Sequence, residues 1–366
     1  MAHACSPMDP KFSCDMNMEI LSRTSLKTLD ITRCINKQFE KLTYDPGFLN
    51  FYKKRNKIVS GFLIQKGGNG YEFAPGPESN NLDLGFLPHD AKILASSEQG
   101  IMVFESPHPQ LQDSIVYHVC KPSSKQVLPL PYPKTSYTTD NVYMVMVGSK
   151  PLHYKIVRLS DYTSDTDYGN GRCTSYHCEI FDSREWTWRV KDHVILPYTV
   201  YIKSNYQWIT TRGSIYMLLS NKEVLKFDAY SEEWTTFSTP IQTLYYPFSE
   251  NPRLRKLVKY QGKLGFACMT PSLHSWEIWV LTVDQSWEKL DVLDMKKDIA
   301  KLSLVAIYDA DTWVMNEFKT LVFYSFKEGG CISKARKSYG GYSPIRILPF
   351  RSDFEPIDLK PVNLKG

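Results

Sequence analysis

The chemically capable side chains in this sequence do not form a recognisable catalytic set. Cys173, His177 and Cys178 lie close enough together to offer two or three metal ligands, but no second cluster completes a tetrahedral site. His118 and Cys120 are two residues apart on a predicted strand and would share one of its faces. We interpret this pair as packed or half-exposed side chains rather than as a nucleophile and its base.

Two other segments have residue types found in binding or catalytic sites, but the sequence around them does not fit such a site. The glycine-rich segment 66–70 is followed by no Lys-Ser/Thr pair and has no strand–loop–helix pattern around it. It is predicted to be a hairpin turn rather than a phosphate-binding loop. The acidic pair Glu232-Glu233 lies in an apparent turn, which predicts two solvent-exposed carboxylates.

The common catalytic and cofactor motifs are absent from the sequence. No G-x-S-x-G, H-E-x-x-H, Walker-type or dinucleotide-binding pattern occurs. We therefore expect an interaction protein rather than an enzyme, with no catalytic residue, no cofactor and no bound metal.

The composition favours a folded protein outside the membrane. Hydrophobic residues make up 42% of the 366 residues and charged residues 23%, and no apolar run reaches the roughly 18 residues that a membrane span needs. The N-terminus lacks the basic and apolar regions of a secretory signal. The eight cysteines are scattered without a C-x-x-C pair, which predicts reduced thiols and a location in the nucleus, the cytoplasm or both.

The excess positive charge is concentrated at the N-terminal end. The net charge is +5, and residues 1–57 hold most of that excess. No basic stripe with interleaved aromatic residues follows, so we expect no nucleic-acid partner. A solvated helix surface, or one that contacts an acidic protein, explains this charge better.

The larger part of the chain is predicted to be β-structure. Short apolar or alternating runs are bounded by Gly, Pro, Asn, Asp or Ser, and no convincing amphipathic helix interrupts them. The predicted strands lie in 58–65, 100–106, 114–120, 142–148, 154–160, 213–220 and 276–283. Segments 121–126 and 164–172 are predicted turns or loops.

A weak internal repeat favours a β-propeller. An apolar residue and Asp precede a Trp at three places: Phe181-Asp182 with Trp186, Phe227-Asp228 with Trp234, and Val283-Asp284 with Trp287. The intervals of roughly 46 and 56 residues lie near the length of a propeller blade. A β-sandwich is the alternative, but a closed propeller leaves fewer strand edges unpaired.

The segment 12–44 is predicted to form three short helices. Ile31, Ile35, Phe39 and Leu42 recur at helical spacing, which predicts one apolar face. Two shorter apolar stripes precede them: Met18 with Leu21, and Leu26 with Leu29. The segment 44–47, which contains Asp-Pro-Gly, is predicted to stop the helix. Such a small unit buries little surface alone and completes its core against a partner or a neighbouring domain.

Three stretches of this helical segment carry a resemblance: Glu19-Ile20-Leu21-Ser22-Arg23, Leu26-Lys27-Thr28-Leu29, and Arg33-Cys34-Ile35-Asn36-Lys37-Gln38-Phe39. In order and spacing they resemble the F-box of plant F-box proteins, and segment 42–48 is similar to the usual exit of that motif. The β-region resembles the F-box-associated domain of the same proteins at 154–159, 213–216, 225–228, 257–264 and 276–281.

The resemblance implies the substrate-recognition adaptor of an SCF-type ubiquitin ligase. The F-box would dock on the Skp-family linker protein and through it on cullin, while the β-domain would bind an unknown target protein. The residues implied for the linker contact are Ile20, Leu21, Leu26, Leu29, Ile35 and Phe39, with Arg33 and Lys37 at the polar margin. Several of these residues could instead hold the three helices together.

The chain departs from the family pattern at three places. Phe12-Ser13 and Thr24-Ser25 replace Leu-Pro steps, and Phe39 replaces a Trp. These changes motivate a second hypothesis, a propeller-type binding protein whose F-box no longer engages the ligase.

The resemblance and the patterning together divide the chain into three regions. We expect a mainly β protein with an F-box-like helical domain at 12–57, a propeller-like domain at 58–350 and a C-terminal tail at 351–366. Whether residues 334–366 close the propeller or trail from it stays open. The loop 161–173 is a candidate for target recognition.

Overall fold

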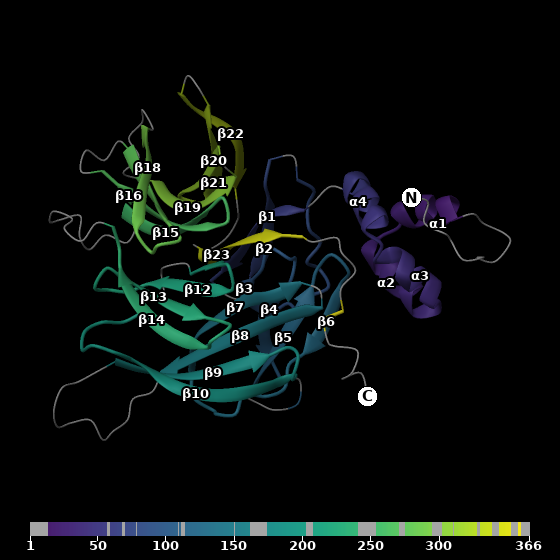
Figure 1. Ribbon diagram of the computed structural model, residues 1–366, viewed down its shortest axis with the longest axis horizontal. Coiled ribbons are helices and arrows are strands. Elements are labelled where there is room, and N and C mark those ends of the chain that lie inside the picture. The colour runs from purple at the N-terminus through teal and green to yellow at the C-terminus, as the bar shows by residue number, and fades with distance from the viewer. Residues whose placement is uncertain are drawn as a thin grey trace.

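The computed structural model places four helices before a ring of β-sheets (Figure 1). The described residues are 14–359, apart from 57–58, 68–69, 78, 109, 111–113, 150, 162–173, 203–207, 241–253, 271–274, 295–301, 310, 328–329, 339–343 and 353–357. The candidate loop 161–173 lies, except for Asp161, outside the described residues.

The helical unit consists of α1 Cys14–Ser22, α2 Leu26–Ile35, α3 Lys37–Thr43 and α4 Pro46–Arg55. Side-chain caps start three of these helices: the oxygens of Ser25, Asn36 and Asp45 accept hydrogen bonds from the first backbone N–H groups of α2, α3 and α4. Short polar residues therefore define where α2, α3 and α4 begin.

For this unit, one expectation was confirmed and one was wrong. The segment 44–47 ends α3 as predicted, but it also starts an unexpected helix, α4, because Asp45 caps it and Pro46 stands at its first position. The stripe from Ile31 to Leu42 is not one helix face, since Asn36 adopts an extended conformation and separates α2 from α3. The expected stripes of Met18 with Leu21 and of Leu26 with Leu29 do pack into the unit's core.

Six antiparallel sheets follow within the described part of the chain. Five of them have four strands each: β3 Lys92–Ser96 to β6 Gln126–Pro129, β7 Thr139–Ser149 to β10 Thr187–Leu196, β11 Ile209–Thr211 to β14 Glu233–Ser238, β15 Arg255–Tyr260 to β18 Trp287–Asp294, and β19 Leu302–Asp309 to β22 Gly330–Ser338. The two middle strands of each of these sheets are, in chain order, β4 Met102–Pro107, β5 Ile115–Lys121, β8 Leu152–Asp161, β9 Thr174–Asp182, β12 Ser214–Leu218, β13 Glu223–Asp228, β16 Lys263–Met269, β17 Ser275–Leu281, β20 Thr312–Glu317 and β21 Thr320–Lys327.

The sixth sheet closes the ring with strands from both ends of the domain. β1 Ser60–Lys66 pairs with β2 Tyr71–Pro75 on one side and with the C-terminal β23 Pro344–Arg351 on the other. The strands that begin the other sheets (β3, β7, β11, β15 and β19) lie side by side around the ring, and β23 completes the circle beside β3. The fold is thus a six-bladed β-propeller with short N-terminal helices. The sequence predicted the propeller and the helices but not the number of blades. Each of the seven predicted strand segments contains a strand. Of the two possibilities left open for residues 334–366, closure of the ring is the one observed, through β23.

The two faces of the ring differ in their connections. On the face that we call the hairpin face, the innermost strand of each four-stranded sheet turns directly into the second, as at Arg212-Gly213 and Gln261-Gly262. On the opposite face, the loop face, each four-stranded sheet connects to the next sheet, as in 130–138. β1 begins on the hairpin face, so the helical unit joins the ring there and lies away from the loop face (Figure 1).

Candidate functional site

Three of the predicted linker-contact residues form the core of the helical unit itself. Leu21, Leu26 and Leu29 are at most 8% exposed and pack with residues of the later helices. Phe39 is half-buried against the same core. The apolar stripes identified in the sequence therefore hold the four helices together.

Other predicted contact residues lie on the surface of the helical unit. Ile20 on α1 is 48% exposed and Ile35 at the end of α2 is 71% exposed, while Lys37 is exposed on α3. Ile31, one helical turn before Ile35, is also exposed and shares its side of α2. A small unit that leaves these isoleucines in water has an apolar surface available to another protein.

Arg33 lies in a different environment from the one expected for a polar margin. Its side chain is only 7% exposed, and its guanidinium group stacks 4.0 Å from the ring centroid of Tyr44. The nitrogen Nη2 lies 3.9 Å from Oδ2 of Asp358 in the C-terminal segment. Arg33 thus contacts another part of its own chain.

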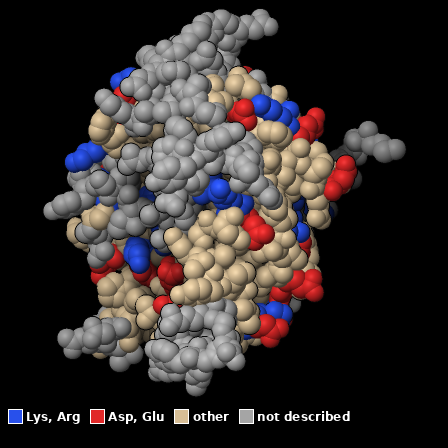
Figure 2. Space-filling model, turned by 90° about the vertical axis from the view of Figure 1, so that its left-hand side faces the viewer, with Lys and Arg blue, Asp and Glu red and all other residues tan. Residues whose placement is uncertain are grey.

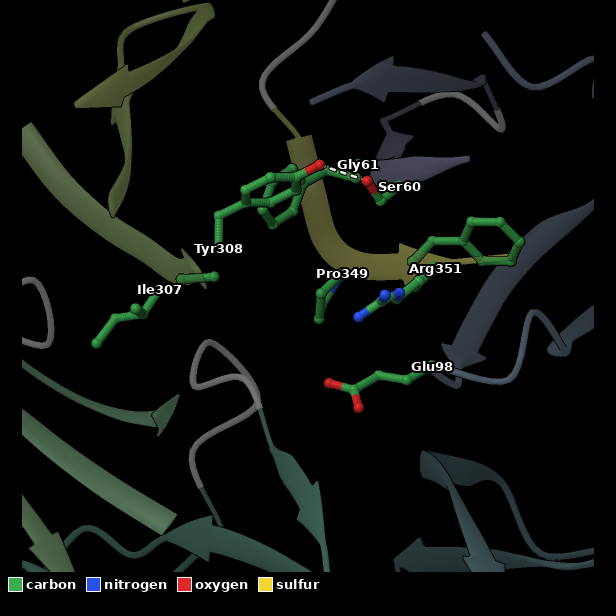
Figure 3. Close-up of a pocket in the computed structure, with 10 residues that line it drawn as sticks. Ser60, Gly61, Glu98, Ile307, Tyr308, Pro349 and Arg351 are labelled. Carbon is green, nitrogen blue, oxygen red and sulfur yellow. Dashed lines mark hydrogen bonds between the residues drawn. The ribbon is translucent and has the colours of Figure 1, made fainter. Parts of the chain in front are cut away.

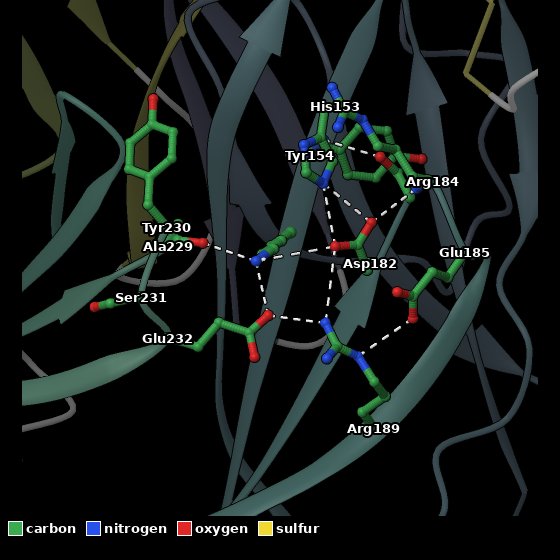
Figure 4. Close-up of polar contacts among 12 residues, drawn as sticks. His153, Tyr154, Asp182, Arg184, Glu185, Arg189, Ala229, Tyr230, Ser231 and Glu232 are labelled. Carbon is green, nitrogen blue, oxygen red and sulfur yellow. Dashed lines mark hydrogen bonds and ion pairs between the residues drawn. The ribbon is translucent and has the colours of Figure 1, made fainter.

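A charged network joins two neighbouring blades at the hairpin face (Figure 4). Lys155 on β8 donates a 2.7 Å hydrogen bond to Glu232, which lies in the turn between β13 and β14, and Arg189 on β10 donates a second of 2.8 Å. His153 lies 3.0 Å from Asp182 at the end of β9. The expectation that Glu232 is solvent-exposed was wrong, since its side chain is 9% exposed. Sequence spacing gave no sign of this network, because its members come from four separate segments.

The electrostatics of the network favour the ionised form of Glu232. Burial alone would raise the pKa of this carboxyl group, but hydrogen bonds from Lys155 and Lys191 and the charge of Arg189 hold the pKa below its ordinary value. The carboxylate is therefore a fixed negative charge that ties the blades together.

A cavity of about 290 Å³ opens on the hairpin face beside the closing sheet (Figure 3). Ser60 and Tyr308 form a hydrogen bond between their hydroxyl groups at its edge, joining β1 to β19. The carboxylate of Glu98 also lines the cavity, and it accepts a 2.7 Å hydrogen bond from Lys259 on β15. These polar groups are used in contacts between blades.

The loop face presents aromatic and aliphatic side chains in two adjacent sheets. The strands and connections that reach this face in the sheets β3–β6 and β7–β10 carry six exposed large apolar residues: Ile115, Tyr132, Tyr137, Ile195, Tyr198 and Tyr201. Figure 2 looks onto this side of the molecule, where uncharged residues gather to the right of the centre and below it, with charged side chains among them. Tyrosine combines a large apolar area with a hydrogen-bonding group, and it is enriched where proteins bind one another.

The candidate chemical groups of the sequence lie in packed surroundings. His118 is half-buried and stacks on Phe104 at a centroid distance of 4.7 Å, as expected for a packed side chain. Burial raises the pKa of Cys178 to about 12, which keeps its sulfur protonated at neutral pH. Across the described residues, no group of three or more His, Cys, Asp or Glu side chains is arranged to hold a metal ion, and Cys173 is outside them. The 66–70 segment joins β1 to β2, as the predicted hairpin.

None of the helices among the described residues is long and apolar enough to cross a membrane. The longest have ten residues.

Comparisons with known proteins relate the chain to one family. A family model described as the F-box associated beta propeller domain matches residues 69–321. An F-box protein of Arabidopsis thaliana is 28% identical over 172 residues, covering 43% of this chain and 88% of the relative. A second protein of that plant, also named as an F-box protein, is 24% identical over 292 residues, covering 73% of this chain and 67% of the relative.

The solved structures that this chain is similar to share little sequence with it. A Lactobacillus plantarum protein is 10% identical, with a TM-score of 0.42 over 77% of this chain and 83% of its own. The family match is the informative comparison. It starts just before β2 and ends within β21, so it covers most of the ring but not the helices, β1, β22 or β23.

Proposed function

Because the chain belongs to the F-box associated β-propeller family, we propose that it is the substrate-recognition adaptor of an SCF-type ubiquitin ligase. The helical unit would dock on a Skp-family linker protein, which connects it to cullin, and the propeller would bind a target protein. The adaptor itself would perform no catalysis. It would act in the nucleus, the cytoplasm or both, as its reduced thiols suggest.

One observation carries this proposal: the helical unit keeps its own core and still exposes large apolar side chains. Ile20, Ile31 and Ile35 are 48%, 55% and 71% exposed. Isoleucine in water costs free energy that burial against a partner recovers, at roughly 25 cal/mol per Å² of apolar surface. We therefore assign the linker contact to these exposed residues, with Lys37 beside them, rather than to Leu21, Leu26 and Leu29.

The missing Leu-Pro step before α2 does not prevent the helix from starting. Ser25 caps α2, and its Oγ accepts a hydrogen bond from the backbone N–H of Thr28. Thr24 donates a hydrogen bond from its own hydroxyl to the carbonyl of Leu21. The local structure that a proline would preset is thus held by hydroxyl groups, which favours the adaptor over a helical unit that has lost its partner.

The target would bind at the loop face. The helical unit joins the ring on the hairpin face, so a target at the loop face would not compete with the linker protein for space. The exposed tyrosines there, Tyr132, Tyr137, Tyr198 and Tyr201, supply anchors of the kind that dominate protein interfaces.

Binding of the purified full-length chain to a Skp-family linker protein tests the docking step. Ile35→Asp places a charge in the proposed contact and should weaken binding at least tenfold, while Val283→Asp makes the same kind of change at an exposed apolar site of the propeller and should have no effect. Wild-type protein that does not bind the linker would refute the adaptor function. Equal binding by Ile35→Asp and wild type would refute the assigned surface.

A further inference from the structure

Three described residues beyond β23, Ser352, Asp358 and Leu359, connect the C-terminal region to the propeller and to the helical unit. The backbone N–H of Ser352 donates a 2.7 Å hydrogen bond to the carbonyl of Val59, just before β1. Leu359 is 1% exposed and packs in the apolar core shared by the sheets β3–β6 and β7–β10. Its carbonyl accepts a hydrogen bond of 3.1 Å from the buried hydroxyl of Tyr154. Leu359 is therefore anchored in the ring.

Its neighbour Asp358 faces the helical unit. The carboxylate lies 3.9 Å from the guanidinium group of Arg33 on α2, and the two side chains are 34% and 7% exposed. Tyr44, which follows α3, stacks on the same guanidinium group. Arg33 is thereby held between its own unit and the segment that Leu359 fixes to the propeller.

The helical unit has a second, covalent attachment at a different place. α4 ends at Arg55, and the side-chain amide of Asn56 donates hydrogen bonds to the carbonyls of Ser22 and Tyr52. Three residues later, Val59 is buried in the core of the propeller. This connection is short, but a single attachment still permits one rigid body to swing about it.

We infer that Arg33, Asp358 and Leu359 form a positioning joint that fixes the orientation of the docking helices on the propeller. The helical unit is attached to the propeller at two places, at the end of α4 and on α2. Two attachments fix its orientation on the propeller, whereas one alone would leave it free to rotate. The inference rests on the proposed function for its purpose: a ligase adaptor must hold its target at a set distance and angle from the site of ubiquitin transfer. Arg33 is a positioning residue in this account and not part of the linker contact.

The joint is tested on the isolated full-length chain by measuring the distance distribution between two nitroxide-bearing amino acids. They replace the exposed Gln38 on α3 and the exposed Ser231 in the turn after β13. Wild-type protein should give one narrow distribution. Arg33→Glu and Asp358→Arg should each broaden it, because each places like charges together, and the double exchange should restore it. Leu359→Ala should also broaden it, by releasing the anchor.

Arg23→Glu is the matched control. Arg23 lies on the same helical unit, is 70% exposed and pairs with Glu19 within α1, so its reversal should leave the distribution narrow. Thermal unfolding of each variant, followed by tryptophan fluorescence of the propeller, should match wild type for the charge reversals, which separates loss of orientation from loss of fold.

The outcomes separate this inference from the adaptor function. A narrow distribution in both single reversals, or a double exchange that fails to restore it, overturns the joint while leaving linker binding untouched. A chain that does not bind the linker but shows the expected broadening and rescue refutes the adaptor and keeps the joint. Linker affinity of Arg33→Glu should equal that of wild type, and a tenfold loss would place Arg33 in the linker contact instead.

Discussion

Nζ of Lys259 on β15 lies 2.7 Å from Oε2 of Glu98 in the turn between β3 and β4, and so links sheets on opposite sides of the ring. The two side chains are 27% and 52% exposed, so water screens much of their attraction. Glu232 makes a contrasting contact, since it and its partner Lys155 are both less than 10% exposed. The two pairs have similar distances but should differ in what they contribute to stability.

Lys259→Met should change the free energy of unfolding by less than about 1 kcal/mol, because exposed ion pairs contribute little. Urea denaturation of the full-length chain at low and high salt measures this. A loss of several kcal/mol would mean that the Glu98 contact holds the ring together.

Glu232→Gln should destabilise the protein by about 3 kcal/mol. The substitution keeps the shape of the side chain but removes the nearer charged partner of Lys155, which is 8% exposed, and leaves it Asp182 at 3.9 Å. The same urea titration measures the change. Glu233→Gln is the control, since its exposed side chain lies at the start of β14, directly after Glu232, and the substitution should have an effect within about 0.5 kcal/mol.

The network around Glu232 should also make the free energy of unfolding depend on pH in the acidic range. Its pKa in the folded protein is lowered, so the stabilisation is present above the unfolded-state pKa of about 4.3 and is lost as the pH falls through the folded value. Urea midpoints measured from pH 7 down to pH 3 should therefore fall more steeply below about pH 5 in wild type than in Glu232→Gln. Parallel curves would contradict the assignment.

Two glycines in equivalent turns should respond differently to alanine. Gly213 and Gly262 have φ of +72° and +74°, so alanine costs about 1–2 kcal/mol at either position through backbone strain. A methyl group on Gly213 would also lie 2.3 Å from the ring of Tyr230, whereas nothing lies within 4 Å at Gly262. Thermal unfolding should show Gly213→Ala to be less stable than Gly262→Ala by about 1 kcal/mol or more.

Tyr230→Ala tests the cause of that difference. In this background the ring is gone, so the two glycine substitutions should cost the same. A difference that persists would mean that Tyr230 is not the obstacle.

Leu29→Ala should loosen the helical unit without opening the ring. Leu29 is fully buried, and losing its side chain should cost that unit about 2–5 kcal/mol. Hydrogen exchange of the backbone amides in α1–α4 should be faster than in wild type. Exchange of the amides in the middle strands of the propeller sheets should be the same as in wild type. Ile35→Ala, at a 71% exposed position, is the comparison and should leave exchange in both units as in wild type.

Much of the ring was predictable, because strand patterning is local. Runs such as 154–160 have the right length and the right bounding residues, and they are strands. The sequence indicated the tryptophan repeat but assigned the wrong residue to it in one of the three sheets. Trp188, Trp234 and Trp287 hold equivalent places, opposite Phe181, Phe227 and Leu281, whereas Trp186 lies in the turn. The spacing of residues in the sequence does not determine which residues pair across two neighbouring strands, because the length of the turn between them is not known.

The site was less predictable, because exposure depends on which helices pack together. Leu29 and Ile35 are both apolar residues of α2 and look alike in sequence, yet one is fully buried and the other faces water. The unexpected α4 decides this, since its Phe48 and Tyr52 fill the core with Leu29. Arg33 could not be placed either, because its partner Asp358 comes from the far end of the chain.

Closing the ring with β1 and β23 has a consequence for how the protein is made. Ser60 pairs with Arg351, and synthesis of the roughly 290 residues between them takes about 15–60 s at 5–20 residues per second. Until then one edge of β1 has no neighbour, while the docking helices have already left the ribosome. A nascent chain therefore exposes its N-terminal helices before the propeller is closed, and a chain whose synthesis stops before β23 keeps an open, aggregation-prone strand edge.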